Sequence, residues 1–252
     1  RMPAKLYAVH GSHPCEAVKR AMDLKGVDYE VVEFPPPFHV PFQKLRFGKR
    51  TVPGIRFEDG SKLSGSSPIL RRLDELAPEP RMYPDDRVAE AEAWGEEVLQ
   101  AMARRLLWRA FSLNPGAMHG YQAGGKLPPL PRPVIRVMAP FVVRAESKMN
   151  AVSDAAVRAD LQALGEHLAK VDSLIGEGVI GGAVPNAADL QIASSLRLIM
   201  TLQDLAPLLR DRPAAELARR LFGGQAGEVP AGTFPSAWLP ANSSSSSASL
   251  SG

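Results

Sequence analysis

The sequence predicts a small mixed α/β domain followed by an all-α domain. Three observations carry this prediction. Short strand-like and helix-like segments alternate over roughly the first eighty of the 252 residues. The stretch 77–84 then carries three prolines, which is typical of a linker between domains. Beyond it, apolar residues recur only at helical spacing.

The N-terminal elements follow from hydrophobic period and turn signals. Gly26 stands where a helix C-cap is expected, and Pro35, Pro36 and Pro37 end regular structure, so we expect a loop after them. Glu58-Asp59-Gly60 is a hairpin turn signal. The predicted elements are a strand at 5–9, a helix at 15–25, a strand at 29–33, a hairpin of 55–57 with 62–63, and a helix at 66–76.

Four amphipathic helices are predicted in the second domain, at 87–111, 153–175, 186–205 and 213–222. In the first of them, Trp94, Val98, Met102 and Leu106 lie roughly on one stripe. The proline-containing segment 129–143 can be a lid, a dimer element or a long connection. The predicted division is 1–80 for the α/β domain, 81–86 for the linker, 87–239 for the helical domain and 240–252 for a flexible serine-rich tail.

Composition excludes several classes of protein. Hydrophobic residues make up 45% and charged residues 23%, which excludes a wholly disordered chain. A formal net charge of +3 is too small for a nucleic-acid-binding surface, so no nucleic-acid partner is expected. The single cysteine, Cys15, excludes an intramolecular disulfide and a multi-cysteine zinc site. No apolar run approaches the roughly 20 residues of a membrane span, and we expect a cytoplasmic protein without a membrane partner.

Three short motifs occur in a specific order. They are residues 11–15 (Gly-Ser-His-Pro-Cys) before the first helix, 52–54 (Val-Pro-Gly) at the third strand, and 185–189 (Pro-Asn-Ala-Ala-Asp) opening a late helix. On this arrangement of elements, the chain resembles the cytosolic glutathione S-transferase family of the serine type. The resemblance covers about residues 4 to 222.

The resemblance implies a thioredoxin-like N-terminal domain and an all-α helical bundle. It also implies an enzyme in which the thiolate of bound glutathione, or of a related low-molecular-weight thiol, attacks a hydrophobic electrophile. Glutathione would be a co-substrate, no metal would be needed, and the protein would form a homodimer.

Ser12 is the first candidate catalytic residue. A thiol acts as a nucleophile in its ionised form, and a hydroxyl donor together with a helix N-terminus stabilises that anion. By resemblance, Ser12 holds the glutathione sulfur. The alternative is a plain helix N-cap.

Cys15 is the second candidate catalytic residue, because a thiol in a first helical turn has a lowered pKa and could form a mixed disulfide with glutathione. Packing in the core is the interpretation we rank first for Cys15. We expect His10 and His13 to be loop histidines, with His13 at the entrance of the site.

The glutathione-binding candidates are Lys49, Arg50, Val52, Pro53, Gly65 and Ser66. By resemblance, Pro53 follows a cis peptide bond and Val52 pairs its backbone with the cysteinyl part of glutathione. Lys49 or Arg50 would meet the glycine carboxylate, or both could belong to a solvated basic loop. Ser66 matches the family's serine for the γ-glutamyl carboxylate. Gly65 stands where the family usually has an acidic residue, which predicts weaker glutathione binding.

The hydrophobic substrate pocket is expected between the domains, with Trp108, Phe111 and Tyr121 as its residues and Trp94, Met102 and Met118 as further candidates. An aromatic stripe of this kind at helical spacing is more often part of the core. Asn186 and Asp189 predict a structural capping box.

Two other functions remain open at this point. The same scaffold could be a non-catalytic ligand-binding or interaction protein, which Gly65 favours. It could also be a glutathione-dependent thiol reductase that uses Cys15.

Overall fold

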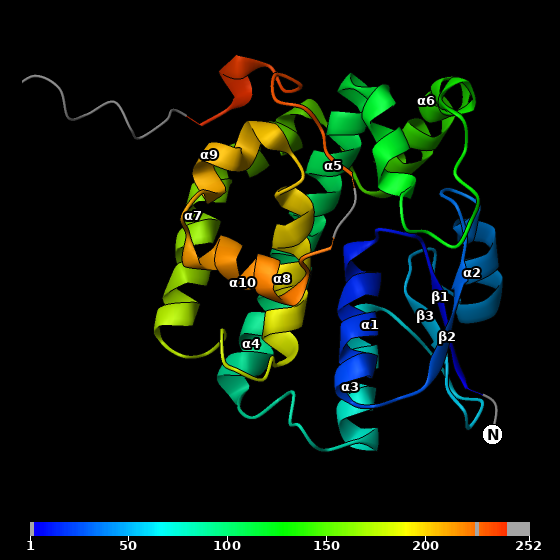
Figure 1. Ribbon diagram of the computed structural model, residues 1–252, viewed down its shortest axis with the longest axis vertical. Helices are drawn as coiled ribbons and strands as arrows, with labels where there is room; N and C mark the ends of the chain where they lie inside the picture. Colours follow the sequence, from blue (N-terminus) through cyan, green and yellow to red (C-terminus); the bar gives the residue numbers. More distant parts are fainter. Residues whose placement is uncertain (1–2, 225–226, 241–252) are drawn as a thin grey trace, which may run out of the picture.

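The computed structural model describes residues 3–224 and 227–240. The predicted serine-rich tail lies outside these residues, apart from Pro240. Within the described residues, the α/β part lies beside an all-helical part (Figure 1). This is the predicted fold class.

A four-stranded mixed sheet forms the N-terminal part, with strand order β2-β1-β3-β4. β1 (Ala4–Ala8) pairs in parallel with β2 (Tyr29–Glu33) and antiparallel with β3 (Gly54–Arg56). β4 (Lys62–Ser64) completes the predicted hairpin with β3. Because β1 and β2 run in parallel, their carboxyl ends lie at the same edge of the sheet.

Two helices, α1 (His13–Leu24) and α3 (Ser66–Leu76), cover the sheet face that looks toward the helical part (Figure 1). Their amphipathic stripes are the reason that both were predicted. The core that they close is fully buried and includes Leu6, Val18, Met22, Ile55, Ile69, Leu70 and Leu73.

α2 (His39–Phe47) corrects the prediction of a loop after the proline run. Pro41 lies in its first turn, where a missing N–H costs nothing. The helix buries only two residues, His39 and Gln43, so it has no apolar stripe to reveal it. It packs against β3 at Gly54, where a Cβ would lie 2.6 Å from atoms of Gln43 and Phe47.

The predicted helix 87–111 is found as α4 (Asp86–Trp94), a π-helical segment η1 (Gly95–Gln100) and α5 (Ala101–Leu113). The π turn moves the buried stripe by one residue, so that Leu99 is buried instead of the predicted Val98. Gly95 permits this arrangement, because a Cβ there would lie 2.9 Å from Ile192 Cγ1. π turns of this kind are often found near functional sites.

The segment 129–143, whose role the sequence left open, lies largely within a helix, α6 (Arg132–Met149). Pro140 and several exposed apolar residues hide its periodicity. The other helices are η2 (Pro115–Gln122), α7 (Asp154–Gly176), α8 (Ala187–Ile199), η3 (Gln203–Leu205), α9 (Ala206–Leu209), α10 (Pro213–Leu221) and η4 (Ser236–Trp238).

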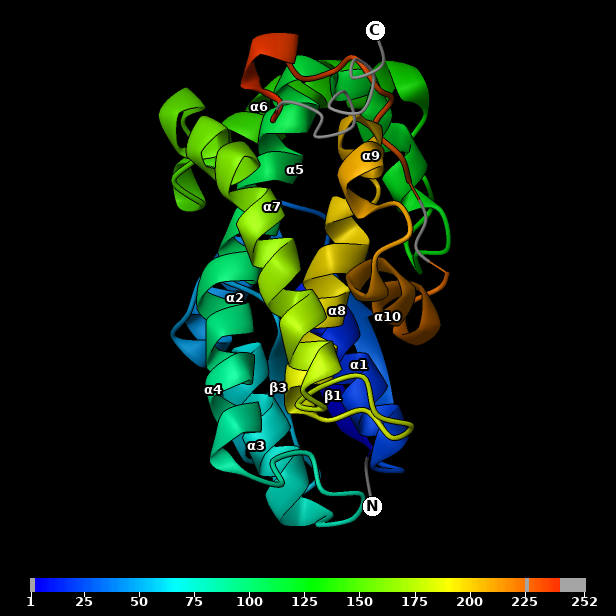
Figure 2. The same cartoon turned by 90° about the vertical axis from the view of Figure 1, so that its left-hand side faces the viewer.

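α8 joins the two parts of the molecule. Every residue of α8 except Arg197 is buried, and the helix runs through the middle of the bundle behind α7 (Figure 2). Its Ala187 and Leu190 belong to the N-terminal core, whereas Ala188 and Ile192 belong to the C-terminal core. The capping box predicted for Asn186 and Asp189 is present at its start.

The segment predicted as a linker is anchored at Met82, which is fully buried in the N-terminal core. Its backbone accepts a hydrogen bond from Ala187 N at 3.0 Å. We propose that residues 81–86 are the boundary between the two domains. No helix in residues 3–224 and 227–240 has the length and apolar character that a membrane crossing requires.

Candidate active site

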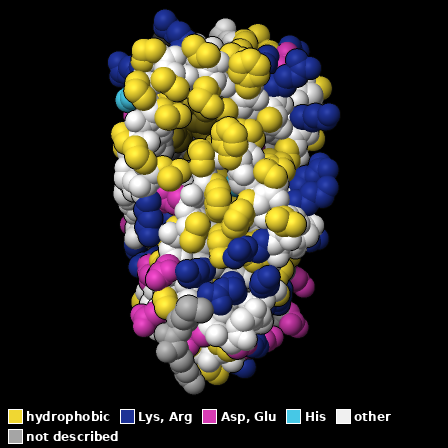
Figure 3. All heavy atoms as spheres, turned by 90° about the vertical axis from the view of Figure 1, so that its right-hand side faces the viewer, with side chains coloured by type: hydrophobic (Ala, Val, Ile, Leu, Met, Phe, Trp, Pro, Cys, Tyr) yellow, Lys and Arg dark blue, Asp and Glu magenta, His cyan; other side chains and the backbone are white. Residues whose placement is uncertain are grey.

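A cavity of about 520 Å³ lies between the carboxyl ends of β1 and β2 and the helices α5 and α6. Figure 3 shows a hollow in the molecular surface whose rim consists mainly of hydrophobic side chains. The α/β part contributes residues 9–13, 33–36, 38–39 and 51–52, and the helical part contributes residues from α5, η2, the following loop and α6. The wall is predominantly apolar, as in most sites for small organic ligands.

Ser12 lies on the cavity wall at the N-terminus of α1. It occupies the N-cap position with extended backbone, but its side chain makes no capping hydrogen bond. Its carbonyl oxygen accepts the bond from Glu16 N at 3.0 Å. The hydroxyl is therefore not used as a cap, and the positive end of the helix lies beside it.

Cys15 is fully buried and is not part of the cavity wall. Burial raises the pKa of the thiol to about 11, and a hydrogen bond from the Ser12 hydroxyl offsets only part of this rise. The helix N-terminus thus does not give Cys15 the lowered pKa that its position suggested. This environment fits the packing role.

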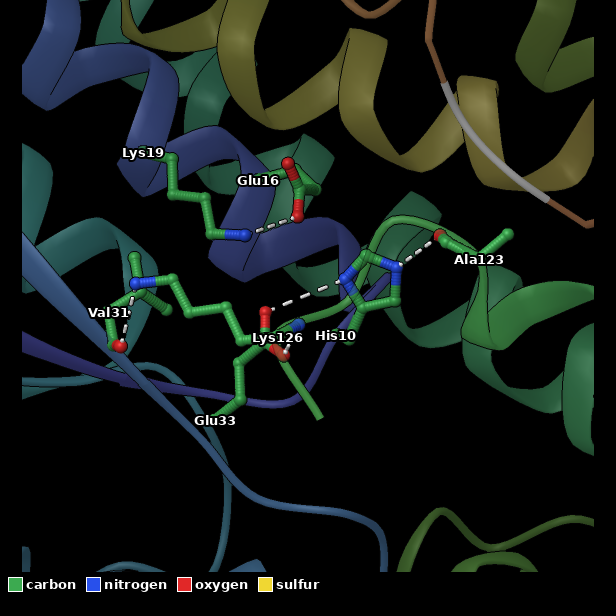
Figure 4. A network of polar contacts seen from close by, with 7 residues as sticks. All are labelled: His10, Glu16, Lys19, Val31, Glu33, Ala123 and Lys126. Carbon is green, nitrogen blue, oxygen red and sulfur yellow. Dashed lines mark hydrogen bonds and ion pairs between the residues drawn. The ribbon is translucent and has the colours of Figure 1, made fainter. Parts of the chain in front are cut away.

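His10 belongs to a polar network at the edge of the cavity (Figure 4). One ring nitrogen, Nε2, lies 2.8 Å from Ala123 O, and the other, Nδ1, lies 3.6 Å from Glu33 Oε1. Glu33 also accepts a hydrogen bond from Lys126 N at 2.6 Å. This network connects the loop after η2 to β2, so both halves of the molecule border the same cavity.

His13 is the first residue of α1 and not a loop histidine. It is buried, and it lies on the cavity wall next to Ser12. Its Nε2 lies 3.2 Å from Gln100 O. Burial, together with the nearby charge of Arg104, holds the pKa of His13 well below its usual value.

The Val52–Pro53 peptide bond is cis, as expected. Val52 and Thr51 lie on the cavity wall and Pro53 is buried beside them. Lys49 and Arg50 are both exposed and are not part of that wall. Of the residues expected to bind glutathione, only Val52 lies on the wall of the cavity with Ser12.

Ser66 lies below the surface between the two parts, where it is 2% exposed. Its hydroxyl accepts hydrogen bonds from Gln191 Nε2 at 2.9 Å and from Gln100 Nε2 at 3.2 Å. Gly65 has a φ of 96°, a backbone conformation that favours glycine over an acidic residue. Neither residue is on the cavity wall, so the structure does not bring them together with Ser12 in one cavity.

The aromatic wall lies on α5 and η2. Trp108 and Phe111 meet edge to face with ring centroids 5.5 Å apart, and Phe111 and Tyr121 do the same at 4.9 Å. All three line the cavity together with Met118. Of the further candidates, Met102 is buried in the helical core. Trp94 packs against His167 at a centroid distance of 5.8 Å, away from the cavity.

The polar residues of the wall that were not predicted include His39 at the start of α2, Arg104 on α5 and Glu146 on α6. The side chains of His39 and Glu146 are each 5% exposed, and His39 Nδ1 lies 3.9 Å from Glu146 Oε1. These two atoms have no hydrogen-bond partner among the described residues. No sequence motif predicts the pair, because His39 and Glu146 belong to different domains.

Burial shifts the pKa of all three groups. It raises the pKa of Glu146 to about 7, although a hydrogen bond from Asn150 and the charge of Arg104 partly oppose it. It lowers the pKa of His39 to about 4 and that of Arg104 below its usual value. Near neutral pH, His39 is therefore uncharged and Glu146 is present in both its protonated and its ionised form.

Comparison with known proteins agrees with this arrangement. Residues 6–81 match the family model described as glutathione S-transferase, N-terminal domain. No curated protein sequence matches the chain.

Solved structures with the same fold cover nearly the whole chain. A glutathione S-transferase from Rhodospirillum rubrum is 19% identical with a TM-score of 0.54, over 93% of this chain and 97% of that one. The β-etherase LigF from a Sphingobium strain is 15% identical with a TM-score of 0.57, over 88% and 99%. A theta class glutathione S-transferase from Xanthomonas axonopodis pv. citri, with glutathione bound, is 18% identical with a TM-score of 0.53, over 87% and 97%.

At these identities, the solved structures establish the fold and not the reaction. The family model and the fold together confirm the resemblance that the three motifs indicated. Residues 6–81 form a glutathione S-transferase N-terminal domain, and the chain has the two-part fold of the glutathione S-transferase family.

Proposed function

We propose that this protein is a glutathione-dependent transferase in which Ser12 stabilises the thiolate of the bound thiol. The observation that carries this proposal is the position of Ser12, on the cavity wall at the N-terminus of α1, with a hydroxyl that does not cap the helix. The hydroxyl and the helix dipole would lower the pKa of a thiol placed between them. The apolar cavity would hold the electrophile beside it.

The thiol of this reaction is glutathione or a related low-molecular-weight thiol. Val52, after which the cis peptide bond lies, would offer its backbone to the cysteinyl part of the thiol. The position of Ser66 supports weaker binding of the γ-glutamyl part than is usual in the family, because the Ser66 hydroxyl already accepts hydrogen bonds from Gln100 and Gln191. We infer an affinity for glutathione that depends mainly on the sulfur and the cysteinyl backbone.

Calorimetric titration of reduced glutathione into the protein tests the proposal, with Ser12→Ala beside the wild type. We expect saturable binding to the wild type, and the ultraviolet absorbance of a bound thiolate. In Ser12→Ala, that absorbance should disappear and turnover of a reactive aryl halide should fall by about 100-fold, as for the loss of one donor to a developing anion.

Ser112→Ala is the matched control, because Ser112 is an exposed serine near the end of α5. It should behave as the wild type. Absence of glutathione binding up to millimolar concentration would refute a glutathione transferase.

The buried Ser66 hydroxyl and Gly65 also favour the second function, a non-catalytic protein that binds apolar ligands on the same scaffold. That function predicts ligand binding in the cavity without turnover. A thiol reductase that uses Cys15 has less support, because the thiol is buried and its pKa is raised. Loss of reductase activity in Cys15→Ser, with Ser12→Ala unaffected, would revive it.

From the family resemblance, we also propose a cytoplasmic homodimer. Sedimentation equilibrium tests the dimer, and a monomer at micromolar concentration would contradict it.

A further inference from the structure

The pair formed by His39 and Glu146 has a geometry that calls for a ligand. Each side chain is 5% exposed, and each presents an atom without a hydrogen-bond partner among the described residues. A buried polar atom without a partner destabilises the folded protein, so a ligand that satisfies both atoms gains affinity. Both residues lie on the wall of the apolar cavity, so a molecule bound there can reach them.

The separation of the two atoms defines the group that fits between them. At 3.9 Å, His39 Nδ1 and Glu146 Oε1 are too far apart to bond to each other. A single oxygen atom can lie at about 2.8 Å from both. With one proton shared over the pair, one of the two atoms donates and the other accepts. A hydroxyl group supplies the matching acceptor and donor on one oxygen.

The remainder of the wall indicates what carries that hydroxyl. Phe34, Trp108, Phe111 and Tyr121 line the same cavity as the pair. Flat aromatic faces favour an aromatic ligand. The Arg104 guanidinium also lines the cavity, and it donates a hydrogen bond to Gln100 Oε1.

We propose that His39 and Glu146 form a subsite for a phenolic hydroxyl group on the electrophilic second substrate, which occupies the apolar cavity. The pair lies on both halves of the molecule, with His39 on α2 and Glu146 on α6. A ligand held by it therefore lies across the domain boundary. That the ligand is a substrate rests on the proposed function. The binding itself, which the proposal predicts, requires no thiol.

The test compares the binding of 1-naphthol and of naphthalene, which share one shape and differ by one hydroxyl. Both are titrated calorimetrically into the protein without glutathione. We expect the wild type to bind 1-naphthol about tenfold more tightly, the value of roughly one net hydrogen bond. In His39→Leu and Glu146→Leu this preference should disappear, while naphthalene binding is kept or improved.

Two further variants sharpen the result. Glu146→Gln retains an amide that donates and accepts, so it should keep most of the preference. Met149→Leu, on the same wall of α6, is the apolar control and should keep all of it. Retained naphthalene binding shows that each variant is folded.

Three outcomes overturn the proposal. The wild type shows no preference for 1-naphthol, or the preference survives both leucine variants, or His39→Leu weakens glutathione binding and leaves the naphthol-to-naphthalene ratio unchanged. The last outcome would assign His39 to the thiol site. Failure of glutathione to bind at all would refute the proposed function and leave this test intact.

Discussion

At the scale of single residues, the sequence was informative where a motif or an aromatic stripe marks the site. Ser12 and Val52 were named as candidates from their motifs, and Trp108, Phe111 and Tyr121 as apolar residues of the long helix and the segment after it. All five line the cavity. His39, Arg104 and Glu146 were missed because nothing local distinguishes them. His39 and Glu146 stand 107 positions apart in the sequence, and only the packing of α6 over the cavity brings them together.

Glu146 should make the stability of the protein depend on pH. Its pKa is raised from 4.5 to about 7, so the folded protein keeps a proton that the unfolded chain releases between these values. Its contribution to the free energy of unfolding is full below pH 4.5 and is lost as pH rises through 7. His39, whose pKa is lowered to about 4, contributes in the opposite direction between pH 4 and 6.5.

Urea unfolding of the wild type and of Glu146→Gln across this range measures the effect. The stability of the wild type relative to the variant should fall as pH rises, by at most about 1.4 kcal/mol per pH unit. Glu90→Gln, an exposed residue on α4, is the control and should parallel the wild type. Parallel curves for Glu146→Gln would contradict the raised pKa.

At the scale of elements, the sequence predicted those that bury an apolar face. β2 and α3 were placed with their observed bounds, because their apolar residues follow the strand or helix period. α2 was missed because its buried residues are His39 and Gln43, and α6 because Pro140 and its exposed apolar residues conceal the period. Both elements that carry the polar pair, α2 and α6, are among those that the sequence did not predict.

The capping box of α8 gives a prediction at this scale. Asp189 accepts hydrogen bonds from Asn186 N at 2.9 Å and from Gly181 N at 2.7 Å, and it is fully buried. We expect Asn186→Ala to lower the free energy of unfolding by about 1–2 kcal/mol. Asp189→Ala should cost more, about 2–4 kcal/mol, because it leaves two N–H groups without an acceptor.

Urea unfolding checks both values. Ser153→Ala is the matched control, because Ser153 caps α7 through a single exposed hydrogen bond, and it should cost about 0.5–1 kcal/mol. Equal losses for Ser153→Ala and Asp189→Ala would show that burial of the box adds nothing.

At the scale of the whole molecule, the two parts should unfold together, because α8 contributes to both cores. All three tryptophans lie in the helical part, whereas the only cysteine lies in the α/β part. Tryptophan fluorescence and the labelling of Cys15 in urea therefore report on different parts. We expect the two probes to give one common midpoint. Leu190→Ala should lower the midpoint seen by each probe by the same amount, with a loss of about 2–5 kcal/mol in the free energy of unfolding.

Two separate midpoints would show independent domains. Ile69→Val, a smaller change within the N-terminal core, is the control. It should lower the free energy of unfolding by about 0.5–1.5 kcal/mol, and the two probes should again give one midpoint.

The double membership of α8 also has a consequence for synthesis on the ribosome. The apolar surface of the N-terminal core that Ala187 and Leu190 cover stays open until the chain has grown roughly 100 residues beyond Met82. At roughly 5–20 residues per second, that delay lasts about 5–20 s. During this interval, the nascent N-terminal half presents an apolar strip to the solvent, so its safe folding would depend on whatever shields the strip at the ribosome exit.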